Sequence, residues 1–136
     1  MKIKPYFNLF HLVVFILILT VSIYSCGSSK PDTNEVSKIN FNLDNFTDDG
    51  AMKHPHKEDR GYISYEFCIP ADDEHFKEVS SIDSTLALYK TSKGRSACSD
   101  KEWLCIGSSH QPNFKKVILA LAKLSYIRKI NETFWE

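Results

Sequence analysis

Cysteine and histidine side chains recur at matching places in two similar stretches of this sequence. The stretches read FCIPADDEHFKEV (67–79) and LCIGSSHQPNFKKV (104–117), and each holds Cys-Ile, a polar turn with a histidine, and Phe-Lys-x-Val. Thiolate and imidazole groups bind metals such as Zn²⁺, and thiolates also act as nucleophiles and redox groups. A metal-handling, redox or hydrolytic site would use Cys68, Cys105, His75 and His110.

The cysteines also have two structural explanations. A free cysteine most often serves as a small buried hydrophobic residue. A structural disulfide is the other explanation, and three thiols (Cys68, Cys98 and Cys105) cannot all pair within one chain. The two pairings that we weigh are Cys68–Cys105 and Cys98–Cys105. Because the sequence has no Cys-x-x-Cys, we predict no metal and no cofactor.

Hydrophobic periodicity indicates two successive β–α–β units. Strict alternation over residues 62–69 predicts a half-buried strand. In the third strand, Leu104 and Ile106 are expected to face the core, with Trp103 and Cys105 on the other side. The expected elements are strands at 62–69, 85–90, 102–107 and 126–135, and helices at 72–82 and 112–124.

The order βαββαβ resembles the ferredoxin-like split βαβ fold. This resemblance implies an α+β sandwich, in which a four-stranded antiparallel or mixed sheet of order 4-1-3-2 has two helices on one face and an open second face. We expect the first and third strands to be parallel neighbours at the centre of the sheet. That arrangement would place Cys68 beside Cys105 on the open face and bring His75 and His110 to one edge.

The N-terminus has the pattern of a secretory signal, since Lys2 and Lys4 precede a long apolar run. The run ends in Ile23-Tyr24-Ser25-Cys26-Gly27, which resembles the lipobox of bacterial lipoproteins. The resemblance implies cleavage before Cys26 and attachment of palmitate and other acyl chains to that residue. Several acyl chains form a stable anchor. An uncleaved membrane helix is the alternative interpretation.

These observations divide the chain into a signal peptide (1–25), a lipidated Cys26 with a flexible tether (26–60) and a folded domain (61–136). The tether is expected from its polar composition and from Pro31 and Pro55. A flexible coil of that length would span roughly 30 Å. Residues 39–43 alternate apolar and polar, so an extra edge strand is an alternative within the tether.

The lipobox resemblance implies a place in the bacterial cell envelope, lipid-anchored and periplasmic or surface-facing, where we expect the folded domain to act as a binding module. A formal net charge of zero gives no general attraction to nucleic acid. We expect a protein or small ligand of the envelope as partner, and the turn 107–109 is a candidate anion site at a helix N-terminus. The alternative is a small enzyme that uses the cysteines and histidines named above. The candidate binding residues are Ser64, Glu66 and Trp103 on the open face and Lys93 and Arg95 on the hairpin.

Overall fold

A computed structural model describes residues 33–54 and 61–133, which form an α+β domain with one four-stranded sheet. The expected signal peptide and lipobox lie outside the described residues. Among the described helices, none has the length and hydropathy that crossing a membrane requires. In chain order the elements are α2 (Thr33–Val36), the 3-10 helix η2 (Leu43–Asn45), β1 (Ser64–Pro70), α3 (Asp73–Ile82), β2 (Ala87–Tyr89), β3 (Glu102–Ser108), α4 (Phe114–Lys123) and β4 (Asn131–Thr133).

Every strand pair of the sheet is antiparallel. The strand order is 2-3-1-4, counted from the β2 edge of the sheet. The expected order, 4-1-3-2, counts from the opposite edge, at β4. The expected parallel pairing of the two central strands is wrong, because β1 and β3 run in opposite directions along all seven residues of each. The end of β1 therefore lies beside the start of β3. Since β1 and β2 are each antiparallel to β3, they are parallel to each other.

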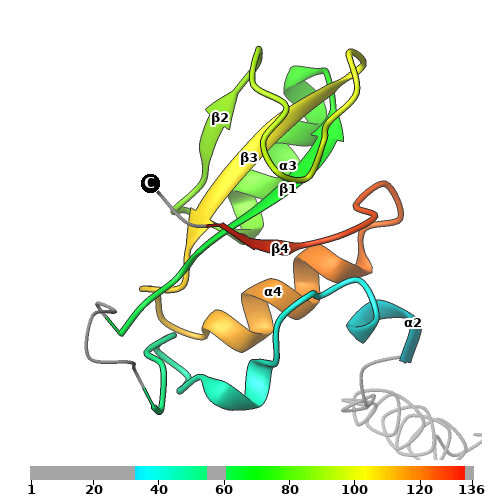
Figure 1. The fold of residues 1–136 in the computed structure, drawn as a ribbon. Helices are drawn as coiled ribbons and strands as arrows, with labels where there is room; N and C mark the ends of the chain where they lie inside the picture. Colours follow the sequence, from blue (N-terminus) through cyan, green and yellow to red (C-terminus); the bar gives the residue numbers. More distant parts are fainter. Residues whose placement is uncertain (1–32, 55–60, 134–136) are drawn as a thin grey trace, which may run out of the picture. The chain divides into compact units, whose positions relative to one another are not determined.

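One face of the sheet carries the main core. Alternation along β1 places Tyr65, Phe67 and Ile69 on this face, where all three are fully buried, as the sequence predicts. The register pairs Phe67 with Cys105, so Cys105 belongs to this core and does not face away from it. Helices α3 and α4 contact each other and cover this face (Figure 1). Their buried residues are Val79, Phe114, Ile118, Leu121 and Ala122.

The second face of the sheet is not open. Residues 91–101, which join β2 to β3, fold back across it on the side opposite α3 (Figure 1). Cys68 and Leu104 pair across β1 and β3 and form a small second cluster with Cys98 from this loop. Ile106 packs against the same cluster, so Leu104 and Ile106 lie away from the main core, contrary to expectation.

The two longer helices begin and end for local reasons. Asp72 caps α3, because its side chain accepts a hydrogen bond from the His75 amide at 2.9 Å. Helix α4 begins at Phe114, later than the expected start at residue 112. Asn113 before it has a left-handed backbone with φ 58°, and the Phe114 amide donates to Asp48 O at 2.9 Å.

Part of the expected tether packs onto the domain. Phe46 is buried, and its ring lies 5.3 Å from that of Phe114 in α4, while Phe41 stacks on the same ring at 6.4 Å. Ile39 forms a single parallel bridge with Ile130. Residues 33–54 therefore contribute to the core, and the six residues 27–32 separate them from Cys26.

A lysine from this N-terminal segment closes the end of α4. The Lys38 ammonium donates to the carbonyl oxygens of Ala122 at 2.8 Å and Leu124 at 2.9 Å. Both carbonyls lie at the helix C-terminus, where they lack partners within the helix and carry the negative end of its dipole. Lys38 thus links the N-terminal segment to the C-terminal end of α4, where a positive charge interacts favourably with the helix dipole.

The last expected strand is shorter than predicted. Strand β4 covers Asn131–Thr133, against 126–135 from the sequence, and residues 134–136 lie outside the described residues. After α4 the chain turns, with the Ile127 amide donating to Leu124 O at 3.2 Å. Ile127 and Ile130 are buried, and the two residues between them, Arg128 and Lys129, are exposed. Because of this turn, only the later part of the expected range pairs as a strand.

Replacing Lys38 with methionine tests the contact between the N-terminal segment and α4. We expect Lys38→Met to lower the free energy of unfolding by about 1–2 kcal/mol, because two helix-end carbonyls lose a charged donor. Urea denaturation measures the change. Lys53→Met is the matched control, since Lys53 is exposed. Equal losses in the two variants would contradict the capping role.

Candidate functional site

The four residues of the predicted metal or catalytic site do not meet. Because β1 and β3 are antiparallel, His75 after β1 and His110 after β3 lie at opposite ends of the sheet. Cys68 pairs with Leu104 and Cys105 with Phe67, so the two cysteines occupy opposite faces. We expected the two cysteines to lie side by side and the two histidines to share one edge. Both expectations required β1 and β3 to be parallel. In the described ranges, no group of three metal-binding side chains comes together.

Cys105 is a free thiol held in an unreactive setting. It is fully buried in the main core. Burial, with a smaller contribution from the charge of Asp83, raises the pKa of the Cys105 thiol from 9.0 to about 12. The thiol therefore stays protonated near neutral pH, whereas nucleophilic cysteines need a depressed pKa and access to solvent.

The histidines have local structural partners. The Nδ1 atom of His75 lies 2.8 Å from both oxygens of Asp72, and its ring meets the Tyr126 ring edge-on at 4.5 Å. The hydrogen bond from the His75 amide, aided by its side chain, lowers the pKa of Asp72. His110 lies over the Tyr62 ring with centroids 4.1 Å apart. Each imidazole thus packs against a different tyrosine ring, and the two lie at opposite ends of the sheet.

The turn before α4 does not offer free amides to an anion. The Ser108 amide donates to Thr85 Oγ1 at 2.9 Å, and the Ser109 amide donates to Ile63 O at 2.9 Å. The His110 amide donates to Ser108 Oγ at 3.2 Å. Ser109 is also fully buried, and its hydroxyl bridges Ile63 N and Gly50 O. This turn joins parts of the domain and does not form the expected anion site.

A buried polar network stands behind this turn, and sequence reasoning missed it. Asp83 has no exposed surface, and its carboxylate accepts hydrogen bonds from the Tyr65 hydroxyl and from the amide and hydroxyl of Thr85. Gln111 Nε2 donates to the Tyr65 hydroxyl at 2.9 Å. Burial, followed by the Asp83 charge, raises the pKa of Tyr65. Gly107 is required here, because a Cβ atom at that position would come within 2.8 Å of Asp83 Oδ2.

The cysteine pairing is one that the sequence did not suggest. Cys68 in β1 forms a disulfide with Cys98 in the loop of residues 91–101, with Cα atoms 5.5 Å apart. Neither of the two expected pairings, both of which used Cys105, occurs. They fail because Cys105 faces the helices while the loop crosses the opposite face. We call residues 91–101 the disulfide-held loop.

The disulfide-held loop has little hydrophobic support of its own. Of its eleven residues only Cys98 is buried. Gly94 has φ 55°, and Ala97 adopts φ 52°, a left-handed conformation that costs a non-glycine residue about 1–2 kcal/mol. The Cys98 amide donates to Lys93 O at 2.9 Å. The loop conformation therefore depends on its attachments to the sheet.

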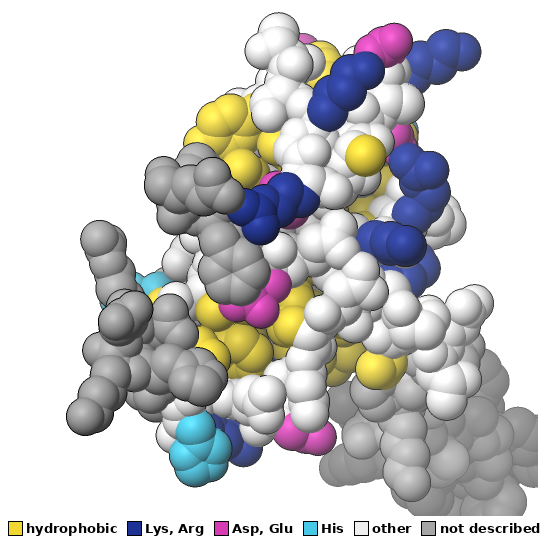
Figure 2. All heavy atoms as spheres, viewed as in Figure 1, with side chains coloured by type: hydrophobic (Ala, Val, Ile, Leu, Met, Phe, Trp, Pro, Cys, Tyr) yellow, Lys and Arg dark blue, Asp and Glu magenta, His cyan; other side chains and the backbone are white. Residues whose placement is uncertain are grey.

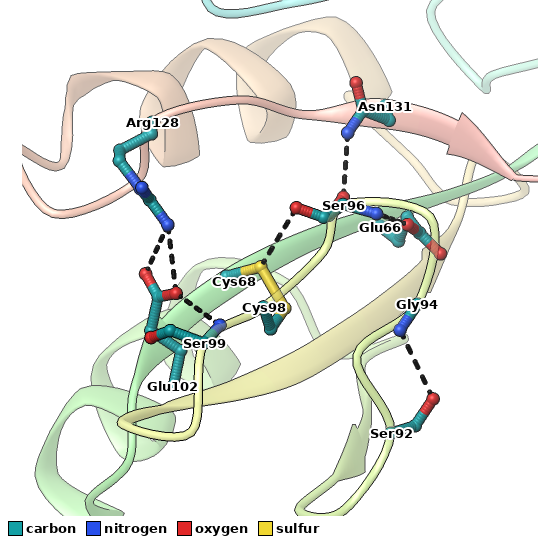
Figure 3. Close-up of a disulfide and its surroundings, with 10 residues drawn as sticks. All are labelled: Glu66, Cys68, Ser92, Gly94, Ser96, Cys98, Ser99, Glu102, Arg128 and Asn131. Carbon is teal, nitrogen blue, oxygen red and sulfur yellow. Dashed lines mark hydrogen bonds and ion pairs between the residues drawn. A yellow bond between two sulfur atoms is a disulfide. The ribbon is translucent and has the colours of Figure 1, made fainter.

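Three attachments hold the middle of the loop (Figure 3). Besides the disulfide, the Ser96 amide donates to the carboxylate of Glu66, a β1 residue with only 1% of its surface exposed. Asn131 Nδ2 of β4 donates to Ser96 Oγ at 2.8 Å. Glu66 is thus a charge buried beneath the loop, and removing the loop would expose it.

A cavity of about 330 Å³ opens beside the disulfide. Its lining comes from Cys68, Ser96 and Ala97 on one side and from Arg128 and Lys129 on the other. Arg128 Nη2 binds both oxygens of Glu102, at 2.8 and 2.9 Å, and the Glu102 carboxylate also accepts from the Ser99 amide. Figure 2 shows a group of Lys and Arg side chains over the segment that joins α4 to β4.

The predicted binding residues lie in three different places. Ser64 and Glu66 lie on the sheet face that the loop covers, and Glu66 is buried. Trp103 is half-buried on the helix side, where Lys90 Nζ lies 4.0 Å from its ring centre.

Lys93 and Arg95 remain exposed, both on the disulfide-held loop. Lys93 Nζ forms an exposed ion pair with Asp100 at 2.9 Å. The loop and its cavity are therefore the candidate functional site. The sequence signal that could have pointed to it is the combination of Cys98 with a basic, turn-rich stretch.

The raised pKa of Cys105 predicts a loss of stability at alkaline pH. The folded protein keeps a proton that the unfolded chain releases, so this residue contributes stability below pH 9.0 that disappears as the pH rises toward about 12. Above pH 9.0 it should lower the free energy of unfolding by up to about 1.4 kcal/mol per pH unit.

Urea denaturation from about pH 8 to about pH 10 measures this slope. Cys105→Ala and Cys105→Ser should both flatten it, since neither side chain titrates in that range. An unchanged slope in both variants would assign the alkaline loss to another group.

The chain matches no protein-family model, no curated protein and no solved structure. No relative therefore carries a function over to it. What the molecule does has to be inferred from the loop, the disulfide and the cavity themselves.

Proposed function

We propose that this protein is an envelope lipoprotein, anchored through Cys26, whose folded domain binds an acidic partner through the disulfide-held loop. The observation that carries the proposal is the Cys68–Cys98 disulfide. Disulfides persist in oxidising compartments outside the cytoplasm. This agrees with a chain that begins with a signal-like run and the lipobox-like residues 23–27.

The loop has the charge expected of a binding surface for an acidic group. Residues 91–101 contain three basic residues and one acidic residue. Lys93 and Arg95 are exposed near its tip. Basic side chains at an interface steer an acidic partner toward the loop and help to fix its orientation.

The attachments of the loop favour binding in a second way. Ordering a flexible loop on binding costs about 0.5–1.5 kcal/mol for each side chain that is immobilised. The disulfide, the Ser96–Glu66 hydrogen bond and the Asn131–Ser96 hydrogen bond order this loop before any partner arrives. A preorganised basic loop suits a recognition module better than it suits the cysteine–histidine enzyme considered from the sequence, whose four residues lie apart.

The position of the domain relative to the lipid follows from chain length. If Cys26 carries the lipid, the six residues 27–32 join it to Thr33. Fully extended, such a link spans at most about 20–25 Å, and the folded domain has a radius of gyration of about 13 Å. The proposed module therefore works close to the membrane surface, and not at the end of a thirty-residue tether.

We further propose that the domain is a ferredoxin-like split βαβ sandwich. Two features support this. Each β–α–β unit, β1-α3-β2 and β3-α4-β4, joins strands that are parallel to each other and have one antiparallel strand between them. Both helices contact each other over one face. An experimental structure in which another strand separates β1 from β3 would refute the assignment.

The lipid anchor is tested with Cys26→Ser. In cells that process lipoproteins, we expect the wild-type protein to stay with membranes after a carbonate wash and to gain the mass of acyl chains. The variant should lack that mass. Cys105→Ser is the matched control, because it removes a different cysteine that is free and buried. An acyl-free wild-type protein that still remains in the membrane would favour an uncleaved helix.

The binding role is tested by reversing the exposed loop charges. Partners cross-linked to the wild-type lipoprotein in native envelopes are identified, and their dissociation constants are measured with purified proteins. We expect Lys93→Glu with Arg95→Glu to weaken binding about tenfold, the equivalent of about 1.4 kcal/mol, and the effect to shrink in high salt. The control, Lys77→Glu with Lys116→Glu, makes the same charge change at exposed positions on the helices. Equal weakening by both pairs would mean that the loop is not the binding surface.

A further inference from the structure

The two cysteines of the disulfide differ in their access to solvent. Cys68 is 8% exposed and lines the cavity, whereas Cys98 is 1% exposed and belongs to the small cluster beneath the loop. Cys68 Sγ lies 3.9 Å from Ser96 O, at the side of the loop that borders the cavity (Figure 3). A reagent that enters the cavity would therefore meet Cys68 first.

The charged groups around the cavity favour an anion there. Arg128 and Lys129 line it, and Glu102 carries the opposing charge, bound to Arg128. Within the described residues, Lys129 is not matched by a carboxylate in any ion pair. Glu66 is screened by the loop, because Ser96 lies over it and accounts for one of its carboxylate oxygens. The side chains that reach the cavity thus leave one positive charge uncompensated.

We propose that this cavity admits a low-molecular-weight thiol that carries carboxylate groups, and that Cys68 is the atom it modifies. The thiol first loses its proton to solvent, and its thiolate attacks Cys68 Sγ. A bond forms between the two sulfurs as the Cys68–Cys98 bond breaks, and the electron pair leaves with Cys98 as a thiolate, which takes a proton from water. A second thiol of the same class can displace the first from Cys68, which releases the oxidised small-molecule disulfide and completes the reduction.

Among the described residues, Cys98 is the thiol that can reverse the reaction. It can attack Cys68 Sγ, expel the small thiol and restore the original disulfide. Cys105, the free cysteine of the described residues, is buried on the opposite face of the sheet and cannot reach either sulfur while β1 and β3 stay paired. The mixed disulfide at Cys68 therefore either returns to the Cys68–Cys98 disulfide or is reduced by a second small thiol, and acid trapping makes it observable.

Opening the disulfide removes the strongest attachment of the loop. At the middle of the loop, the Ser96–Glu66 and Asn131–Ser96 hydrogen bonds remain, in a segment with one buried residue. Its release uncovers Glu66, Leu104 and Ile106 on the second face. The main core, on the other face, loses no contact. The reaction thus changes one surface of the domain and leaves the fold in place, whether or not the proposed binding function is correct.

The experiment compares two small thiols on the purified, full-length protein in its folded state. Glutathione, which carries two carboxylates, and cysteamine, which carries an ammonium group, are used at low salt. The rate of disulfide opening is expressed per thiolate, and the adduct is trapped with acid and mapped by mass spectrometry. We expect the adduct on Cys68, a rate proportional to thiol concentration, and an advantage for glutathione of about threefold to tenfold that salt removes.

Charge variants test the role of the cavity. Lys129→Gln leaves the Arg128–Glu102 ion pair intact and should abolish most of the preference for glutathione. Lys77→Gln is the matched control on α3 and should preserve it. An adduct on Cys98, or an equal preference in both variants, would overturn the proposal. So would a rate that reaches the same ceiling with both thiols, since that behaviour means attack only after unfolding.

Hydrogen exchange tests the release of the loop. After reduction we expect the Ser96 amide to exchange faster, while the amides paired between β1 and β3 stay protected. Unchanged protection at Ser96 would overturn the release, and loss of protection throughout the sheet would show that reduction unfolds the domain.

Discussion

The antiparallel register of β1 with β3 is the constraint on which the rest of the structure depends. It pairs Phe67 with Cys105 and Cys68 with Leu104. Because side chains alternate along a strand, a shift of one residue would exchange the two faces of one strand relative to the other. Either Cys105 would then reach the loop side or Phe67 would leave the core. The position of every candidate residue, including the separation of His75 from His110, follows from this pairing and its direction.

The two faces of the sheet are held by different kinds of interaction. On the helix side, large apolar side chains and the buried Asp83 network support each other, so that face has no single indispensable contact. On the loop side, Cys68, Cys98 and Leu104 are the buried hydrophobic residues, Glu66 is buried with them, and one covalent bond is the main attachment. Because the two clusters lie on opposite faces of the sheet, the loop surface can change while the contacts of the main core stay in place.

The sequence predicts what is local and fails where direction or distant contacts decide. Alternation in residues 62–69 correctly predicts the buried side chains of β1, and the helix expected at 72–82 agrees with α3 to within one residue. Strand direction leaves no mark in such patterns, so the parallel pairing was assumed with the fold. Residues 33–54 were assigned to a tether because their anchors are sparse: one lysine at a helix end and a few aromatic rings hold them.

The disulfide could not be predicted for a related reason. Its partners were weighed by their place on the strands, and Cys98 lies in a loop whose path no periodicity describes. The loop passes over Glu66, which the alternation of β1 places off the core face. Burying this carboxylate without a partner would cost free energy, and the hydrogen bond from the Ser96 amide offsets that cost. The loop above this buried carboxylate is hydrophilic, so a disulfide and hydrogen bonds hold it in place and apolar packing contributes little. The disulfide-held loop is therefore the element that the proposed reaction at Cys68 Sγ would release.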